Sequence, residues 1–403
     1  MEGREFDLTV LGVTGFTGKL VVDYLDKLAG ENKLVGVKIC FAGRNDSAML
    51  RVCNSLKHLA PSFCLADVTK ETSVLDMALR TRVVLALVGP YEALGGEVVI
   101  KSCIQAGAHY VDVTGEGRWM ESMKQKYHEL AQKRGVCLVP FAGQDSVPAD
   151  LTAWFTTSQL PEGDFAQSHA TLQTLVQLPT TQGQLSNGTF KTLLSQPGWS
   201  FDLPVPKHDF STKLTYGVQL VSGISPSLAA FPFLFFPDAN VVRDSHLDQG
   251  LGGRFENNHL LVFPNRPAAL VAKLAFGSLP YLLHLPYAKT LLGKLSDSGG
   301  KVFGPSSRHP NSTPANYVNY GVLKMYPLHS SPGTKPVETI VTRVDCDRDP
   351  YEVTAITCTQ VALALLSPAI TAKHKTGFQT PVSAVGGQEL LERCFECIRV
   401  SKL

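Results

Sequence analysis

Three glycines near the N-terminus have the spacing to bind the phosphates of a dinucleotide. Gly12, Gly15 and Gly18 follow the apolar run 8–11 and open a helical pattern. Gly12 allows a tight turn, Gly15 leaves backbone N–H groups open to a pyrophosphate, and Gly18 lets the helix pack closely on the strand. The predicted phosphate loop also includes Thr14, Phe16 and Thr17. These residues predict a dinucleotide-binding loop over positions 12–18.

Arg44 indicates which dinucleotide is bound. It follows the predicted strand 37–42, where an NAD-specific site usually has Asp or Glu to hold the ribose hydroxyls. A guanidinium can instead bind a 2′-phosphate through two hydrogen bonds. The sequence therefore favours NADP(H) over NAD(H). Asp67, which follows the predicted strand 62–66, either contacts the adenine amino group or caps a helix.

Three further loops end in groups that can exchange a proton. They contain Gly89-Pro90-Tyr91, Thr114-Gly115-Glu116 and, within positions 143–150, Asp145. A phenol or carboxyl group there could donate or accept a proton at a reacting C=O, C=N or C=C bond. Tyr91, Glu116 and Asp145 are thus the candidate catalytic residues, although a structural role is open for each. Val88, Gly89, Pro90 and Tyr91 are also predicted to line the cofactor.

The elements that position these loops alternate between strand and helix. Apolar runs predict strands at 8–11, 37–42, 62–66, 83–88, 110–113 and 136–141. Helical patterns between them predict a doubly wound parallel sheet, the Rossmann type, over residues 1–150. In such a sheet, ligands bind at the carboxyl ends of the strands, where all the loops above lie.

The pattern changes after residue 150. Strand-like alternation at 170–178, 318–325 and 339–344 predicts an α+β domain with a mostly antiparallel sheet over 151–368. Helices are predicted at 353–366 and 388–398. A chain of 403 residues is long enough for two domains.

Composition narrows the choice of partners. A net charge of +2, from 37 basic and 35 acidic residues, gives no basic footprint for nucleic acid. Nine scattered cysteines predict free thiols in a reducing compartment, and the Cys394/Cys397 pair has no further ligands for a metal site. The apolar segments 228–236 and 274–288 fit either a core and dimer interface or a peripheral contact with lipid or a membrane.

The last three residues, Ser401-Lys402-Leu403, have the sequence of an address that the peroxisomal import receptor reads. We therefore expect a peroxisome or a related organelle such as the glycosome, with the cytoplasm as the alternative. Recognition requires a mobile tail, and a helix ending near Ile398 would leave these residues free.

Together these motifs resemble the saccharopine dehydrogenase-like oxidoreductase family. The matching stretches are residues 12–18, 42–44, 88–91, 112–116, 143–150, 349–351 and 380–384. The resemblance implies that residues 369–403 return to the Rossmann domain. It also implies that the middle domain provides the substrate site and a contact for a homodimer.

This family includes enzymes that act on saccharopine and trans-acting enoyl reductases of polyketide or lipid chains, and the loops here look closer to the second group. Saccharopine has several carboxylates, but the candidate arginines are scattered through the middle domain, at Arg243, Arg254, Arg266, Arg308 and Arg343. The first hypothesis is an NADP(H)-dependent oxidoreductase for an apolar or lipid-linked substrate. The alternatives are a saccharopine reductase and a non-catalytic lipid-associated protein that retains the fold.

Overall fold

The chain forms two compact units, each made from two stretches of sequence. The computed structural model describes residues 3–160, 168–177, 218–221, 224–225, 228–232, 236–249, 255–284, 287, 317–327, 334–367, 370 and 376–403. The first unit comprises Met1–Val147 and Pro350–Cys394, and the second comprises Pro148–Asp349 and Phe395–Leu403.

The first unit is built on a seven-stranded sheet with the order β13-β6-β5-β4-β1-β2-β3, and every pair in it is parallel. The strands are β1 (Phe6–Leu11), β2 (Ile39–Gly43), β3 (Ser62–Leu65), β4 (Thr81–Ala86), β5 (His109–Asp112), β6 (Cys137–Val139) and β13 (Gly377–Phe378). The predicted doubly wound sheet is confirmed, and β13 from the end of the chain adds a seventh strand.

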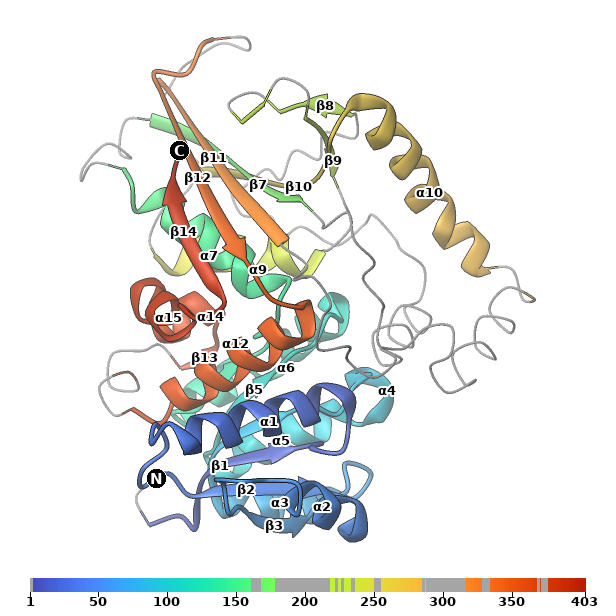
Figure 1. Ribbon diagram of the computed structural model, residues 1–403, viewed down its shortest axis with the longest axis vertical. Coiled ribbons are helices and arrows are strands. Elements are labelled where there is room, and N and C mark those ends of the chain that lie inside the picture. The colour runs from blue at the N-terminus through green and yellow to red at the C-terminus, as the bar shows by residue number, and fades with distance from the viewer. Residues whose placement is uncertain are drawn as a thin grey trace. The chain divides into compact units, whose positions relative to one another are not determined.

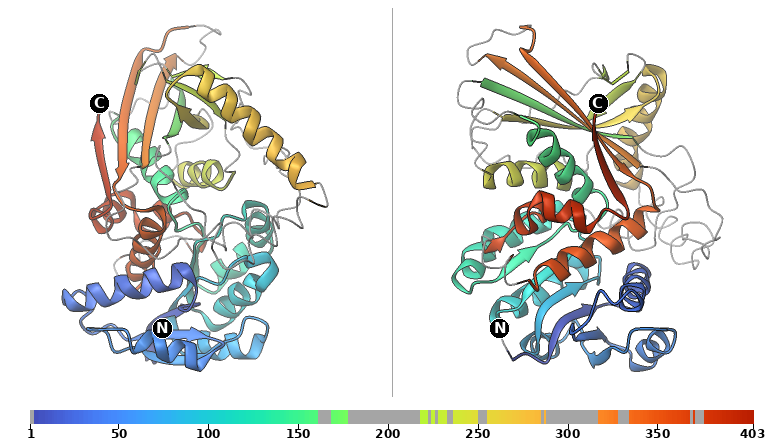
Figure 2. Two further views of the ribbon diagram at one scale, coloured as in Figure 1. Left: turned by 45° about the vertical axis from the view of Figure 1, so that its right-hand side comes forward. Right: turned by 60° about the vertical axis from the view of Figure 1, so that its left-hand side comes forward.

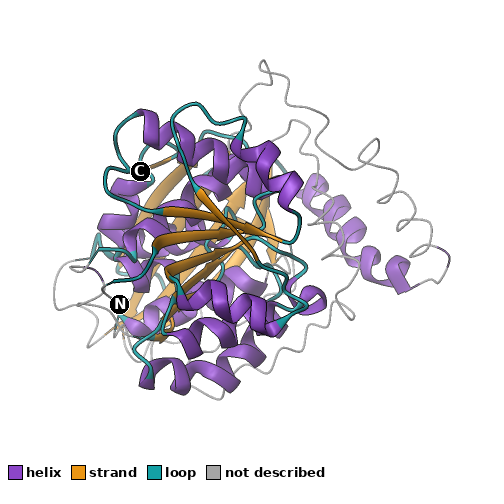
Figure 3. Ribbon diagram, turned by 90° about the horizontal axis from the view of Figure 1, so that it is seen from below, coloured by secondary structure: helices purple, strands orange, loops and turns teal. Residues whose placement is uncertain are grey.

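Helices cover both faces of this sheet (Figures 1 and 3). Helices α1 (Phe16–Gly30) and α12 (Pro350–Ala364) pack together on one face. On the other face, α3 (Glu71–Leu79), α5 (Gly96–Ala106) and α6 (Gly117–Lys133) bury their apolar stripes against the strands. The shorter helices are α2 (Asp46–Cys53), α4 (Tyr91–Leu94), α14 (Pro381–Val385) and α15 (Gly387–Arg393). Because both faces are covered, the central strands are largely apolar, whereas the edge strand β3 exposes Phe63 and Leu65.

The second unit contains a mixed sheet with the order β14-β12-β11-β7-β10-β9-β8. Its strands are β7 (Ser168–Gln177), β8 (Gln219–Leu220), β9 (Ala229–Pro232), β10 (Phe255–Phe263), β11 (Tyr317–Pro327), β12 (Glu338–Cys346) and β14 (Ile398–Lys402). Only β7 and β10 pair in parallel, and all other pairs are antiparallel. The prediction of a mostly antiparallel second sheet is confirmed.

Three helices of the second unit pack on this sheet, namely α7 (Ser146–Thr157), α9 (Phe236–Asp248) and α10 (Arg266–His284) (Figure 2). A glycine permits the closest approach. A side chain at Gly321 on β11 would place its Cβ 1.9 Å from Oγ1 of Thr156 on α7. Without it, Thr156 Oγ1 lies 2.6 Å from Oγ1 of Thr342 on β12, at hydrogen-bond distance.

The unit boundaries and the C-terminus differ from the sequence-based expectation. The first unit ends at Val147, close to the predicted residue 150, but the chain returns to it at Pro350 instead of 369. The predicted last helix, 388–398, ends at Arg393. The segment 395–403 then joins the second unit as part of its sheet.

The expectation of a mobile C-terminal tail is wrong. Ser401 and Lys402 pair with Arg343 and Thr342 of β12, and the Leu403 N–H donates to the Val341 carbonyl at 2.9 Å. The alternating sequence Ile398–Lys402 buries Ile398 and satisfies backbone groups along β12 that an unpaired edge would leave open. The side chains of residues 401–403 are exposed, but their backbone is held in the sheet.

Candidate functional site

The glycines of residues 12–18 differ in what surrounds them. Gly12 adopts φ +99°, a conformation that favours glycine. A Cβ at Gly18 would lie 2.2 Å from the Gly12 carbonyl oxygen, so the start of α1 is packed tightly against the loop. At Gly15, a Cβ would meet only the Gly12 oxygen, at 3.3 Å, and φ is −72°. The turn and the close packing fall at Gly12 and Gly18, while the space lies in front of Gly15.

The N-terminus of α1 is open at this loop. No side chain of the described residues caps it, and its first turn contains no acidic residue. Thr14, Gly15 and Phe16 are exposed beside it. The first N–H groups of a helix have no partner within the helix, and together with the helix dipole they attract phosphate. The cradle in front of Gly15, which a side chain would fill, therefore fits a dinucleotide pyrophosphate.

An aromatic pair lies beside the cradle. The Phe16 ring meets the Tyr351 ring edge to face, with centroids 5.0 Å apart. Tyr351 lies on α12, which follows β12 of the second sheet in the chain. The first helix is thus fixed at its open end by a residue that is distant in sequence.

Arg44 and Asp67 follow β2 and β3 at the same edge of the sheet. Arg44 is exposed, and no other described residue hydrogen-bonds to its guanidinium. Asp67 accepts hydrogen bonds from the Thr69 N–H at 3.1 Å and the Thr69 hydroxyl at 2.8 Å. These two bonds are the main cause that lowers the pKa of Asp67, and the charge of Arg44 adds to it. Asp67 therefore closes the turn before α3, whose N-cap residue is Lys70.

Glu116 and Tyr91, two of the predicted catalytic residues, lie together. The Glu116 carboxylate accepts the Tyr91 N–H at 2.7 Å and the Glu92 N–H at 2.9 Å, at the start of α4. Glu116 is buried, and burial raises its pKa, although these two bonds act in the opposite direction. Its carboxylate thus holds the backbone of the loop that follows β4.

The Tyr91 hydroxyl is also bound to backbone groups. It donates to the Ala86 carbonyl at 2.9 Å and accepts the Val113 N–H at 3.3 Å, so it joins the ends of β4 and β5. The ring is buried and stacks on Trp119, with centroids 6.1 Å apart. Burial raises the pKa of Tyr91 well above its ordinary value, which keeps the hydroxyl protonated.

A buried aspartate that was not among the predicted site residues, Asp112, connects the segments that follow β5 and β6. Asp112 accepts hydrogen bonds from the Tyr110 hydroxyl at 2.6 Å, the Thr114 N–H at 2.9 Å and the Phe141 N–H at 3.2 Å. It is fully buried, and burial raises its pKa to about 7. The sequence does show one acidic residue within the otherwise apolar run 110–113, but this run was interpreted only as a strand.

Asp145 follows β6 on a loop that α12 holds. The Gln144 N–H donates to Thr354 Oγ1 at 3.1 Å, and the Thr357 hydroxyl donates to the Ala142 carbonyl at 2.9 Å. Solvent reaches the Asp145 side chain, yet the surrounding protein atoms desolvate it and raise its pKa to about 6. No other described residue hydrogen-bonds to its carboxylate, in contrast to Glu116.

Comparison with known proteins identifies the domain that holds this site. Residues 8–139 match the family model described as the saccharopine dehydrogenase NADP binding domain. About a third of the chain is thus similar to a saccharopine dehydrogenase NADP-binding domain. The resemblance inferred from the motifs is confirmed, and NADP(H), the expected cofactor, is the one that this domain binds.

The similarity extends beyond the NADP-binding domain. The chain is 27% identical to a Mycobacterium tuberculosis protein named as a trans-acting enoyl reductase, over 97% of this chain and 95% of that protein. It is 28% identical to the human saccharopine dehydrogenase-like oxidoreductase, over 97% and 96%. A Caenorhabditis elegans lipid droplet localized protein is 35% identical over 197 residues, which are 47% of this chain and 44% of that one.

Among solved structures, apo saccharopine dehydrogenase (L-Glu forming) from Saccharomyces cerevisiae matches with a TM-score of 0.58 and 12% identity, over 100% of both chains. At that identity the match establishes the fold. Within the described residues, no helix is long and apolar enough to cross a membrane, and no group of three or more His, Cys, Asp or Glu side chains is arranged to hold a metal ion.

Proposed function

We propose that this protein is an NADP(H)-dependent oxidoreductase that transfers hydride to or from an apolar or lipid-linked substrate. The observation that carries the proposal is the uncapped N-terminus of α1 in front of Gly15, with Arg44 at the same edge of the sheet. The relatives named as oxidoreductases and as an enoyl reductase, which cover nearly the whole chain, support the reaction class.

Each group of predicted site residues is proposed to hold one part of the cofactor. Residues 12–18 would hold the pyrophosphate, and Arg44 would bind the 2′-phosphate through charge-assisted hydrogen bonds. Residues 88–91 would line the nicotinamide side. When bound, the cofactor supplies or accepts the hydride. The protein holds the cofactor and the substrate in position and exchanges the proton.

Asp145 is proposed as the group that exchanges the proton. A pKa of about 6 leaves both protonation states populated near neutral pH, which suits general acid–base catalysis. Tyr91 and Glu116 are proposed to position the loop after β4, because their polar atoms are bonded to backbone groups. Asp145→Asn should therefore abolish a pH dependence of turnover near pH 6 without changing NADPH affinity.

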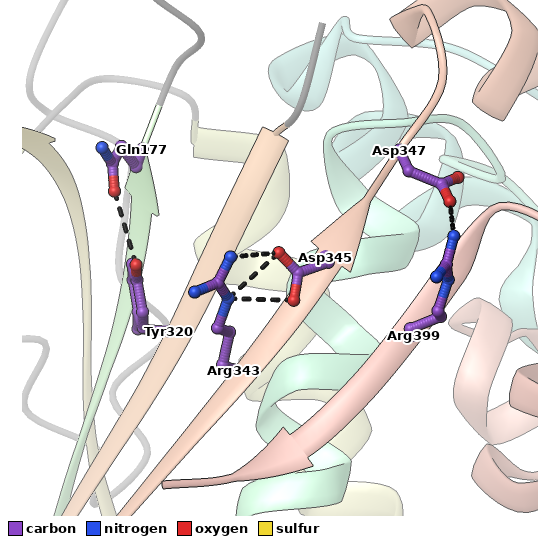
Figure 4. A network of polar contacts seen from close by, with 6 residues as sticks. All are labelled: Gln177, Tyr320, Arg343, Asp345, Asp347 and Arg399. Atoms are coloured by element: carbon purple, nitrogen blue, oxygen red, sulfur yellow. Dashed lines mark hydrogen bonds and ion pairs between the residues drawn. The ribbon is translucent and has the colours of Figure 1, made fainter. Parts of the chain in front are cut away.

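Two of the five candidate arginines already have acidic partners, which weighs against saccharopine as the substrate. Arg343 is bound to Asp345 by hydrogen bonds of 2.6–3.0 Å, as Figure 4 shows, and Arg243 is bound to Asp244 at 3.0 Å. Arg266 is exposed at the start of α10. Arg254 and Arg308 lie outside the described residues. The two internally paired guanidiniums are not available to bind the carboxylates of a substrate without losing their partners.

The test has two steps with the full-length protein. Fluorescence titration with NADPH and NADH should show tight binding of NADPH, and no binding of either would favour the non-catalytic alternative. NADPH oxidation is then followed with α,β-unsaturated acyl thioesters, and NADP⁺ reduction is followed with saccharopine. Consumption of the enoyl substrates would support the proposal, whereas turnover of saccharopine alone would overturn the substrate assignment.

A further inference from the structure

Among its described side chains, helix α10 directs the larger apolar ones away from the sheet on which it packs. On the inner side of its first half, Ala269 and Ala272 pack against Ala229 of β9 and Leu261 of β10. Its outer face contains Leu270, Val271 and Leu274, which are 47%, 69% and 74% exposed. A surface helix of a soluble protein normally has the opposite arrangement, with its large apolar residues turned inward.

The exposed residues form one stripe. Positions 267, 270, 271, 274, 275 and 278 recur at spacings of three and four along the helix, and all are exposed. A further exposed apolar residue, Leu220, lies on the sheet and not on the helix. It is 59% exposed and pairs with Ala229, so it lies on the sheet face that α10 covers. Tyr287, 91% exposed, follows the end of the helix.

The charges on this helix have one sign. Between positions 266 and 284, the residues that are charged at neutral pH are Arg266 and Lys273, and there is no acidic residue. Basic side chains that border an apolar stripe complement the phosphates of a phospholipid surface, and a tyrosine beyond the helix end suits the headgroup level.

We propose that the outer face of α10 docks on a phospholipid surface, with the helix lying in the plane of the headgroups. The same face is poorly suited to a second copy of this chain, because a symmetric contact would bring basic residues together without an acidic partner on the helix. The proposal is independent of the reductase activity proposed above.

The experiment is flotation of the full-length protein with vesicles of phosphatidylcholine, with and without phosphatidylserine. The wild type should float with the vesicles, and more strongly with the anionic ones. Val271→Glu/Leu274→Glu should weaken the partition by more than about tenfold, because two apolar side chains no longer enter the lipid. Since both positions are exposed, the variant should unfold at the temperature of the wild type. Leu79→Glu, at a 53% exposed position on α3 of the first unit, is the matched control and should float normally.

Further measurements on the same variants distinguish lipid docking from the alternatives. Val271→Trp should give blue-shifted emission with vesicles and be quenched by brominated lipid, which supports the proposal. Equal flotation of the wild type and the double Glu variant, or no flotation of the wild type, would overturn it. Conversion of a dimer to a monomer by the double Glu variant would assign the face to a second copy and likewise overturn it. NADPH titration of the same variants should be unchanged, so this proposal can fail without affecting the proposed reductase.

Discussion

The carboxyl edge of the first unit's sheet has two ends that are built in opposite ways. At the phosphate end, formed by residues 12–18 and Arg44, the first turn of α1 is uncapped and the guanidinium is exposed. At the β4–β6 end, formed by the loops after those three strands, Tyr91, Asp112 and Glu116 use their polar atoms on the protein's own backbone.

This difference fits the roles proposed for the two ends. Binding a charged, strongly hydrated phosphate requires donors that are already positioned and still free. Positioning a reacting ring requires rigid loops, and a rigid loop has its polar groups satisfied internally. Asp145 is the exception at the β4–β6 end, because no described residue hydrogen-bonds to its carboxylate.

The largest expected effect tests the phosphate end. Gly18→Ala should destabilise the protein by about 4 kcal/mol or more, because the new Cβ would lie 2.2 Å from the Gly12 carbonyl oxygen. Gly15→Val should leave the protein folded but abolish NADPH binding, since its side chain would enter the open cradle. Thermal unfolding and calorimetry separate the two. Normal NADPH affinity in Gly15→Val would show that the cradle is not the phosphate site.

The next effect tests the rigid end through pH. The folded protein holds the Asp112 proton up to about pH 7, whereas the unfolded chain releases it near the ordinary value of 3.8. The folded state therefore binds more protons within that window, and its stability should fall as pH rises through it. Between about pH 5 and about pH 8 the loss due to Asp112 should be on the order of 3 kcal/mol. Urea unfolding checks this, and an Asp112→Asn variant with the same pH dependence as the wild type would contradict it.

A smaller effect concerns cofactor choice. Arg44→Asp should weaken NADPH binding by about 2 kcal/mol, roughly thirtyfold, because a charge-assisted phosphate contact is lost and an acid is introduced. NADH affinity should stay the same or rise. Fluorescence titration with both cofactors measures the change. Equal affinity of the wild type for NADPH and NADH would remove Arg44 from the site.

The smallest effect concerns the loop after β4. Glu116→Gln keeps one acceptor oxygen but loses the charge and one of the two N–H bonds, and should lower the free energy of unfolding by about 1.5 kcal/mol. Glu92→Gln, at the exposed neighbouring acid, is the control and should change it by less than about 0.5 kcal/mol. If Glu116→Gln kept full stability but lost turnover, Glu116 would be a catalytic residue instead of a positioning residue.

The sequence by itself determined six of the seven parallel strands of the first unit and the glycine turn that follows the first of them. Strand runs such as 8–11 and 83–88 are read from local composition, because strands buried on both faces must be apolar along their whole length. The glycine spacing 12–15–18 is equally local, since the reason for each glycine lies in the backbone of the same short loop. The NADP(H) prediction depended on Arg44 alone, at a strand end that periodicity can locate.

Only the tertiary structure decided what the polar side chains at the β4–β6 end do. Tyr91 and Glu116 are candidates because of their residue type and position. Their polar atoms, however, are hydrogen-bonded to backbone groups that no local pattern predicts. Asp112 joins the loops after β5 and β6, and Tyr351 reaches Phe16 across more than 300 positions. The local pattern predicts a helix end and a free tail at the C-terminus, whereas residues 398–402 form β14, because β12 offers an edge that no local pattern reveals. Periodicity reports burial along one segment, but a hydrogen-bond partner is set by which distant segment the fold brings next to it.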